Sequence, residues 1–259
     1  MSDVIVTREG PVTTLTLDRP DRRNALDPGL LGALASAIDD VSNDDGVRVV
    51  VLTGAGSAFS AGADLEWMRA SVDLSDERNR EDTAVMAAAF ETIDRCPKAV
   101  IARVNGAAIG GGAGLVACAD VAVAVEGARF AFAEARLGLI PAVISPYVLR
   151  AIGSGRAREL FTSGRPFEAA EAERYGLVHR VVAEDALDAW VGMLVQNFLV
   201  CGPQAVSANK RLVRDATASL ALPDLPDRIA EVRASAEGQE GIAAFLEKRA
   251  PGWLSSAGS

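Results

Sequence analysis

The chain has 259 residues, 49% of them hydrophobic, which is enough for one large domain or for a core with a small appendage. Its formal net charge of -9 argues against nucleic acid or an anionic membrane as the main partner, because both are bound by clustered Lys and Arg. The three cysteines lie far apart, which argues against a metal site or a disulfide framework, and no uninterrupted 18-residue apolar segment occurs. We therefore expect a cytoplasmic protein that does not span a membrane, and a phosphorylated small ligand remains compatible with its charge.

Two β-branched runs at residues 4–7 and 12–17 are separated by a Gly-Pro turn and predict an N-terminal β-hairpin. Asp27 and Pro28 then supply a helix N-cap and a first-turn proline, and the apolar residues that follow repeat at helical spacing. We expect this helix to end near residues 43–46.

Two strongly apolar runs, residues 47–53 and 99–104, predict buried strands, and each leads through a small-residue loop into a helix. Gly110, Gly111 and Gly112 follow the second strand. Because glycine has no Cβ, a ligand can approach this backbone closely, and the free N–H groups and positive dipole end of a helix starting here would face it. The chemistry that this arrangement favours is stabilisation of a negatively charged oxygen.

Two further segments carry expectations about function. Residues 73–82 are charged and have little apolar periodicity, so they predict a mobile loop or lid before helical spacing returns at residues 83–95. Glu134 lies among apolar neighbours, a setting that raises the pKa of a carboxyl group by desolvation and suits proton transfer.

The rest of the chain alternates short strands and helices. Strands are predicted at residues 121–125, 127–132 and 177–182. Helices are predicted at residues 145–152, 155–162, 167–175, 186–200, 203–218, 228–236 and 242–248, with an interruption at 222–226.

Five groups of residues occur in order along nearly the whole chain: Asn24-Ala25-Leu26, Phe59 to Leu65, Asn105-Gly106 with Gly110-Gly111-Gly112, Cys118-Ala119-Asp120, and Phe245 to Arg249. In this combination the chain resembles the crotonase superfamily, also called the enoyl-CoA hydratase/isomerase family. The resemblance implies an α/β fold, with a spiral of ββα units over residues 1–200 and a helical region at 201–259 that forms trimers, often paired into hexamers. It also implies a coenzyme A thioester substrate and no separate cofactor.

By position in the family, the backbone N–H groups of Ala63 and Gly111 hold the thioester oxygen, and Glu134 is the acid/base. Such donors matter because enolate charge builds on that oxygen during the reaction. Family hydratases commonly hold a second glutamate, and its position here is Gly114. For Glu134, a salt bridge with Arg136 is the structural alternative.

Further substrate contacts follow from the resemblance. Arg22 and Arg23 precede the turn where the family binds adenine and phosphate, with a solvated loop as the alternative. Phe245 and Lys248 match a C-terminal pair that can contact coenzyme A across a subunit boundary, with a plain helix face as the alternative. The remaining predicted contacts are Ala25, Ala61, Ala63, Asp64, Leu65, Glu66, Gly111 and Pro141. Asp64 is also a candidate N-cap, and the single histidine, His179, is expected to be structural.

The run from Glu134 to Tyr147, together with Gly62 to Met68, is similar to bacterial hydratases of branched glutaconyl-type CoA esters. This similarity favours an enoyl-CoA hydratase. The alternatives are an enoyl-CoA isomerase, in which the one glutamate shuttles a proton, and a non-catalytic acyl-CoA binding protein.

Overall fold

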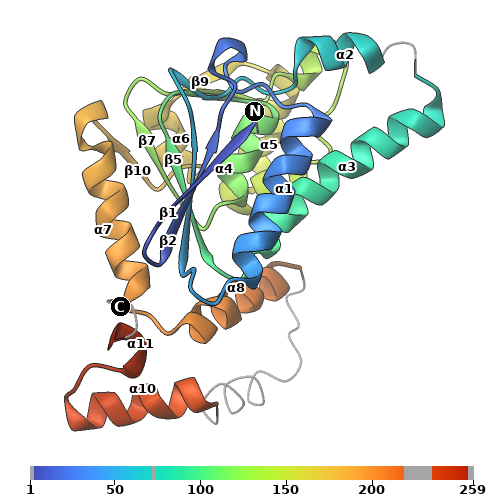
Figure 1. Cartoon of the computed structure of the whole chain (residues 1–259). Coiled ribbons are helices and arrows are strands. Elements are labelled where there is room, and N and C mark those ends of the chain that lie inside the picture. Colours follow the sequence, from blue (N-terminus) through green and yellow to red (C-terminus); the bar gives the residue numbers. More distant parts are fainter. Residues whose placement is uncertain (1–2, 72–73, 219–234, 256–259) are drawn as a thin grey trace.

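A six-stranded sheet forms the centre of the molecule, and the computed structural model describes residues 3–71, 74–218 and 235–255 (Figure 1). β1 (Val4–Glu9) and β2 (Val12–Leu17) form the predicted antiparallel hairpin. The strands β3 (Val49–Gly54), β5 (Ala99–Val104), β7 (Val121–Val125) and β10 (Arg180–Val182) then add in parallel, in the order β1-β2-β3-β5-β7-β10. Every residue of β3 is buried, as expected for a parallel strand covered on both faces.

A second sheet is built from four short strands: β4 (Ala58–Ser60), β6 (Ala107–Ile109), β8 (Arg129–Ala131) and β9 (Pro166–Glu168), in that order. The first three follow directly on β3, β5 and β7 and pair in parallel, and β9 pairs antiparallel with β8. Three turns of the chain, which begin with β3, β5 and β7, therefore each add a strand to the larger sheet, a short strand to the smaller one, and then a helical segment. This arrangement is the predicted spiral of ββα units.

Helices cover both faces of the six-stranded sheet (Figure 1). α1 (Pro28–Asn43) packs on β1, β2 and α3 (Asp76–Arg95), while α4 (Gly111–Cys118) packs between α3 and α5 (Ser145–Ser163). On the other face, α7 (Leu187–Leu199) contacts β3, β5 and β7. The short helices α2 (Leu65–Ser71) and α6 (Ala169–Tyr175) complete this part of the chain.

Local sequence signals account for several helix boundaries. The side chain of Asp27 accepts a hydrogen bond from Leu30 N, and Pro28 occupies the first helical position, so α1 begins where predicted. The two helices predicted at 145–152 and 155–162 share the label α5, but Gly153, with a φ of +75° and a ψ of 162°, breaks the helix between them. Residues 166–168 form β9 before α6 begins, and the strand predicted from residue 177 begins only at Arg180.

The loop or lid predicted at residues 73–82 is wrong, because α3 already begins at Asp76. Ser75 caps the helix by accepting Arg78 N, and Arg78 pairs with Glu81 one turn later. Of the charged residues that suggested a loop, Glu77, Arg78, Arg80 and Glu81 are exposed on the solvent side of this helix, whereas Asp82 is half-buried. Residues 72 and 73 lie outside the described part of the chain.

The C-terminal helices are α8 (Pro203–Ala218), α10 (Ala236–Glu247) and α11 (Gly252–Ser255). α10 begins before the predicted residue 242, and its Glu237 accepts N–H groups at the start of α8, from Gln204 at 2.9 Å and Ala205 at 2.7 Å. The predicted interruption at 222–226 and most of the helix predicted at 228–236 lie outside the described residues. The division of the chain near residue 200 stays a prediction. No described helix is long and apolar enough to cross a membrane.

Candidate active site

A cavity of about 560 Å³ opens where the segments that follow β4, β6 and β8 meet α2 and α3. The backbone of Ala63 and Gly111 forms part of its wall. Glu134 reaches the same cavity from the 3-10 turn η2 (Glu134–Leu137), which follows β8. Two loops and a carboxylate that are far apart in the sequence therefore meet at one place.

Ala63 is held with its amide directed away from the neighbouring strand. It forms an isolated parallel bridge with Leu26, in which Leu26 N donates to Gly62 O at 2.7 Å and Asp64 N donates to Leu26 O at 2.8 Å. In such a parallel pairing the central residue directs its own N–H to the opposite side. Gly62 has a φ of +88°, and a Cβ there would lie 2.7 Å from Ile109 O, so only glycine fits between the two loops.

Gly111 is the first residue of α4, and its N–H has no acceptor within the helix. Gly110 before it has a φ of 50° and a ψ of -117°, a conformation that residues with side chains rarely adopt. In residues 3–71, 74–218 and 235–255, neither Gly111 N nor Ala63 N donates a hydrogen bond to another protein group. Both amides are therefore available to a ligand in the cavity.

Glu134 is an unpaired carboxylate in an apolar environment. Its Oε2 is buried and has no hydrogen-bond partner among the described residues. Burial raises the pKa of this carboxyl group, and a hydrogen bond from its own backbone opposes the shift only in part. A Cβ on Gly110 would lie 3.0 Å from Glu134 Oε1, so the carboxylate lies against the glycine loop. The alternative salt bridge with Arg136 does not form, and the Arg136 side chain lies beside Gly164 instead.

Gly114, at the position of the family's other glutamate, is enclosed by side chains. A Cβ there would lie 2.3 Å from Ile144 Cγ2 and 3.1 Å from Phe90 Cε1. The site therefore contains Glu134 without a second carboxylate at that position.

Arg22 is already bound to two other predicted contacts. Its Nη1 lies 2.7 Å from Glu66 Oε2 and 3.2 Å from Asp64 Oδ2. Asp64 also caps α2, since its Oδ1 accepts Glu66 N at 2.8 Å, which agrees with the N-cap expected from the sequence. Arg23 is exposed and forms no ion pair with another described residue. A phosphate that binds Arg22 would compete with Glu66.

Three further predicted contacts line the cavity: Ala61, Leu65 and Pro141. Ala25 is buried, and its carbonyl accepts a hydrogen bond from Arg19. Lys248 is exposed at the end of α10, at the opposite end of the molecule from α2 (Figure 1). One chain therefore does not place Lys248 at the cavity, and the side chain of Phe245 lies outside the described structure.

α3 supplies cavity residues that were not identified from the sequence: Asn79, Asp82, Thr83 and Met86. Asp82 faces α2, where Trp67 Nε1 donates to Asp82 Oδ2 at 3.3 Å. Asn79 and Asp82 lie in the segment predicted as a loop, whereas Thr83 and Met86 lie in the predicted helix, where nothing in the sequence distinguishes a cavity residue from a core residue. Ser75 followed by two acidic residues is the helix-start signal that identifies this segment as helical.

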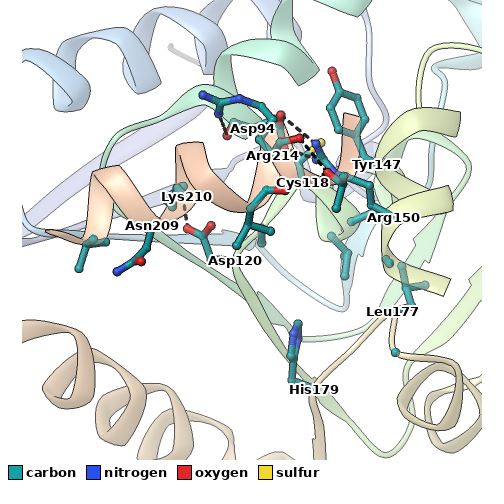
Figure 2. Close-up of a pocket in the computed structure, with 18 of the residues that line it drawn as sticks. Asp94, Cys118, Asp120, Tyr147, Arg150, Leu177, His179, Asn209, Lys210 and Arg214 are labelled. Carbon is teal, nitrogen blue, oxygen red and sulfur yellow. Dashed lines mark hydrogen bonds and ion pairs between the residues drawn. The ribbon is translucent and has the colours of Figure 1, made fainter. Parts of the chain in front are cut away.

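A second cavity, of about 600 Å³, lies between α4, α5 and α8 (Figure 2). Its charged groups are largely paired with one another: Asp94 with Arg150, and Asp120 with Lys210 at 2.7 Å. His179 Nδ1 accepts Ala122 N at 3.1 Å, which supports the structural role expected for this histidine. Among the described residues, no group of three or more His, Cys, Asp or Glu is placed to hold a metal ion.

Comparisons with known proteins agree with this architecture. Residues 7–256 match the enoyl-CoA hydratase/isomerase family. The structure of an enoyl-CoA hydratase from Shewanella pealeana matches with a TM-score of 0.93 and 37% identity, over 97% of this chain and 96% of that one. A crotonyl-CoA hydratase from Syntrophomonas wolfei is 34% identical over 263 residues, 98% of each chain. A 2,3-dehydroadipyl-CoA hydratase from Escherichia coli is 34% identical over 255 residues, 97% of this chain and 98% of that one.

These matches extend over nearly the full length of each partner, and the structural match includes both sheets and their covering helices. The predicted α/β fold, a crotonase-like spiral of ββα units, is confirmed by them. The chain belongs to the enoyl-CoA hydratase/isomerase family, the crotonase superfamily.

Proposed function

We propose that this protein is an enoyl-CoA hydratase, which adds water across the 2,3 double bond of an acyl-CoA thioester. The observation that carries the proposal is the meeting of the free amides of Ala63 and Gly111 with the unpaired carboxylate of Glu134 at one largely apolar cavity. The names of full-length relatives support the same activity.

The two amides would stabilise the charge that water addition creates. When the oxygen of water attacks C3, the electrons of the double bond move toward the thioester carbonyl, and its oxygen becomes an enolate oxygen. The N–H groups of Ala63 and Gly111 donate to this oxygen, and the positive end of the α4 dipole adds to their effect. Removing one such donor typically costs about 3 kcal/mol of transition-state stabilisation.

Glu134 would supply the proton chemistry. As a carboxylate it takes a proton from the attacking water, and as the resulting acid it returns a proton to C2, so that the enzyme ends each cycle unchanged. Burial raises the pKa of Glu134, which brings the carboxyl group closer to the pH at which proton transfer in both directions is efficient.

Coenzyme A would enter as part of the substrate, with no separate cofactor. Arg22 and Arg23 are proposed to contact its adenine and phosphates, and Phe245 and Lys248 its remaining part. Because Lys248 lies far from α2 within one chain, its contact requires a neighbouring subunit, as in the homotrimer or hexamer that the family resemblance implies. The cytoplasmic location expected from the composition stays a prediction.

An enoyl-CoA isomerase is the second candidate, and the enclosed Gly114 favours it, because isomerisation needs one proton-shuttling carboxylate. An isomerase would convert 3-enoyl to 2-enoyl esters without incorporating oxygen from solvent. Turnover in ¹⁸O-labelled water therefore distinguishes the two, since only hydration places the label in the product. A non-catalytic acyl-CoA binding protein would bind both esters and convert neither.

The proposal is tested by following the loss of the conjugated absorbance of crotonyl-CoA with the purified protein. Glu134→Gln should lower kcat by about 10²- to 10⁴-fold, because a general acid/base is removed while the shape of the side chain is kept. Glu184→Gln, an exposed glutamate in the turn before α7, is the matched control and should leave the rate unchanged. Full activity of Glu134→Gln would refute the assignment.

A further inference from the structure

The acyl group is the part of the substrate that the comparisons leave open. Relatives of equal identity, 34%, are named for crotonyl-CoA, whose acyl chain is neutral, and for 2,3-dehydroadipyl-CoA, whose chain ends in a carboxylate. A neutral and a negatively charged acyl chain need different side chains around them, so the residues that line the active-site cavity bear on which class this protein accepts.

The charged side chains of the cavity are all acids. Of its described lining residues, Asp82 and Glu134 are ionisable, and none is a lysine, an arginine or a histidine. Large apolar side chains make up most of the remaining wall, including those of Trp67, Met86 and Ile140. A second carboxylate on the acyl chain would lose its hydration on entering this cavity and would find no described cation there to compensate.

Asp82 has no cationic partner among the described residues. It accepts a hydrogen bond from Trp67 Nε1 at 3.3 Å, and no described arginine or lysine forms an ion pair with it. Arg78, one turn earlier on α3, is paired with Glu81 at 2.8 Å instead. The Trp67 hydrogen bond links Asp82 to α2, so that the acid is held between the two helices that form one wall of the cavity.

We propose that Asp82 makes this cavity selective for neutral acyl chains and disfavours acyl-CoA esters that carry a second carboxylate. The inference rests on the proposed function for the coenzyme A part of the ligand and deepens it for the acyl part. Glutaconyl-type esters, which the local sequence similarity suggested, carry such a carboxylate and belong to the disfavoured class. Asp82 acts here as a specificity residue, through repulsion of the wrong substrate.

The test compares the binding of hexanoyl-CoA and adipyl-CoA by titration calorimetry. Both acyl groups have six carbons and no double bond, so neither is hydrated, and they differ by a terminal methyl against a terminal carboxylate. We expect wild type to bind hexanoyl-CoA at least about tenfold more tightly, and Asp82→Asn to narrow the ratio of dissociation constants by about tenfold at low salt. Glu77→Gln removes an exposed α3 charge that does not line the cavity and should leave the ratio unchanged.

Salt dependence supplies a measurement that needs no variant. Added salt should reduce the ratio of the dissociation constants of adipyl-CoA and hexanoyl-CoA in wild type, because screening weakens the repulsion between Asp82 and the adipyl carboxylate. Equal affinities in wild type, or a ratio that Asp82→Asn leaves unchanged, would overturn the role of Asp82. Because binding is measured with unreactive esters, failure to hydrate crotonyl-CoA would count against the proposed function alone.

Discussion

The Cβ position of Gly114 lies 2.3 Å from Cγ2 of Ile144, so the space from which the family's other glutamate would extend holds a packed core side chain. Ile144 is only 3% exposed, and Phe90 closes another side of the same space. The lack of a second carboxylate at this position is therefore built into the packing of α4 against its neighbours. One substitution cannot restore it.

Gly114→Ala should destabilise the protein by about 1–3 kcal/mol, because the added methyl group overpacks the core. Gly114→Glu should be less stable still and should not raise hydratase activity. Urea unfolding at fixed protein concentration measures the first expectation, and the crotonyl-CoA assay measures the second.

Gly155→Ala is the matched control for this substitution, since a Cβ at this helical glycine meets nothing within 4 Å. We expect a gain of roughly 0.5–1 kcal/mol there, because alanine favours the helix over glycine. Ile144→Ala should cost less stability in the Gly114→Ala background than in wild type, because alanine lacks the Cγ2 atom that the added methyl group meets. An unchanged urea midpoint for Gly114→Ala would show that Ile144 and Phe90 accommodate the added methyl group without loss of stability.

The stability of the protein should depend on pH through Glu134. Burial raises the folded-state pKa of this carboxyl group above its ordinary value of 4.5, so the folded state binds the proton more tightly than the unfolded state. The resulting stabilisation is present below the unfolded-state pKa and is lost as the pH rises through the folded-state pKa. Glu134→Gln, which stays neutral, should therefore exceed wild type in stability at about pH 8, with the difference shrinking toward about pH 4.5. Urea midpoints across this range provide the measurement, and a gap that grows as the pH falls would contradict the sign.

Signals that are local in the sequence predicted the elements they control. Asp27 with Pro28 marked the start of α1, and the strand before Gly110 marked the start of α4. The charge and weak apolar periodicity of residues 73–82 favour a loop in the sequence, whereas the structure starts α3 at Asp76 because Ser75 is its N-cap. Composition describes what a face is made of, whereas the capping residue determines where a helix begins.

The family resemblance predicted that Ala63, Gly111 and Glu134 belong to one site, but other contacts between distant segments were beyond prediction from a single sequence. Nothing near Gly114 indicates that Ile144 fills the space beside it, and nothing near Asp82 indicates that it faces a cavity with Glu134. Arg22 was expected at a phosphate, yet the fold places it against Glu66, whose position depends on the loop after β4. Glu134 could be identified from the sequence because its neighbours in the chain are apolar. The structure agrees with that environment, since Oε2 of Glu134 is buried.

Lys210 should anchor α8 to the six-stranded sheet. Its Nζ donates to Asp120 Oδ2 at 2.7 Å and to Lys98 O at 2.8 Å, while the same Asp120 oxygen accepts Val100 N at the start of β5. Lys210→Met should cost about 3 kcal/mol, because it leaves a largely buried carboxylate without its cation. Asp120→Asn in the same chain should recover part of this loss, and urea unfolding of both single variants and the double variant measures the coupling. As a comparison, Arg8→Met breaks an exposed ion pair with Asp44 and should lower the stability much less than Lys210→Met does, because solvent screens the exposed charges.

His179 should make the protein less stable under mildly acidic conditions. Its Nδ1 accepts the N–H of Ala122, and this bond requires the nitrogen to be unprotonated. Burial lowers the pKa of His179 below its ordinary value of 6.5, although the carboxylate of Asp120 opposes the shift. A depressed folded-state pKa contributes stability that is present above the unfolded-state pKa and is lost as the pH falls through the folded-state pKa. Melting temperatures between about pH 7.5 and about pH 5 should therefore fall more steeply for wild type than for His179→Asn, whose amide oxygen can accept the same N–H without titrating. Parallel profiles for the two proteins would show that the hydrogen bond to Ala122 contributes nothing to the pH dependence.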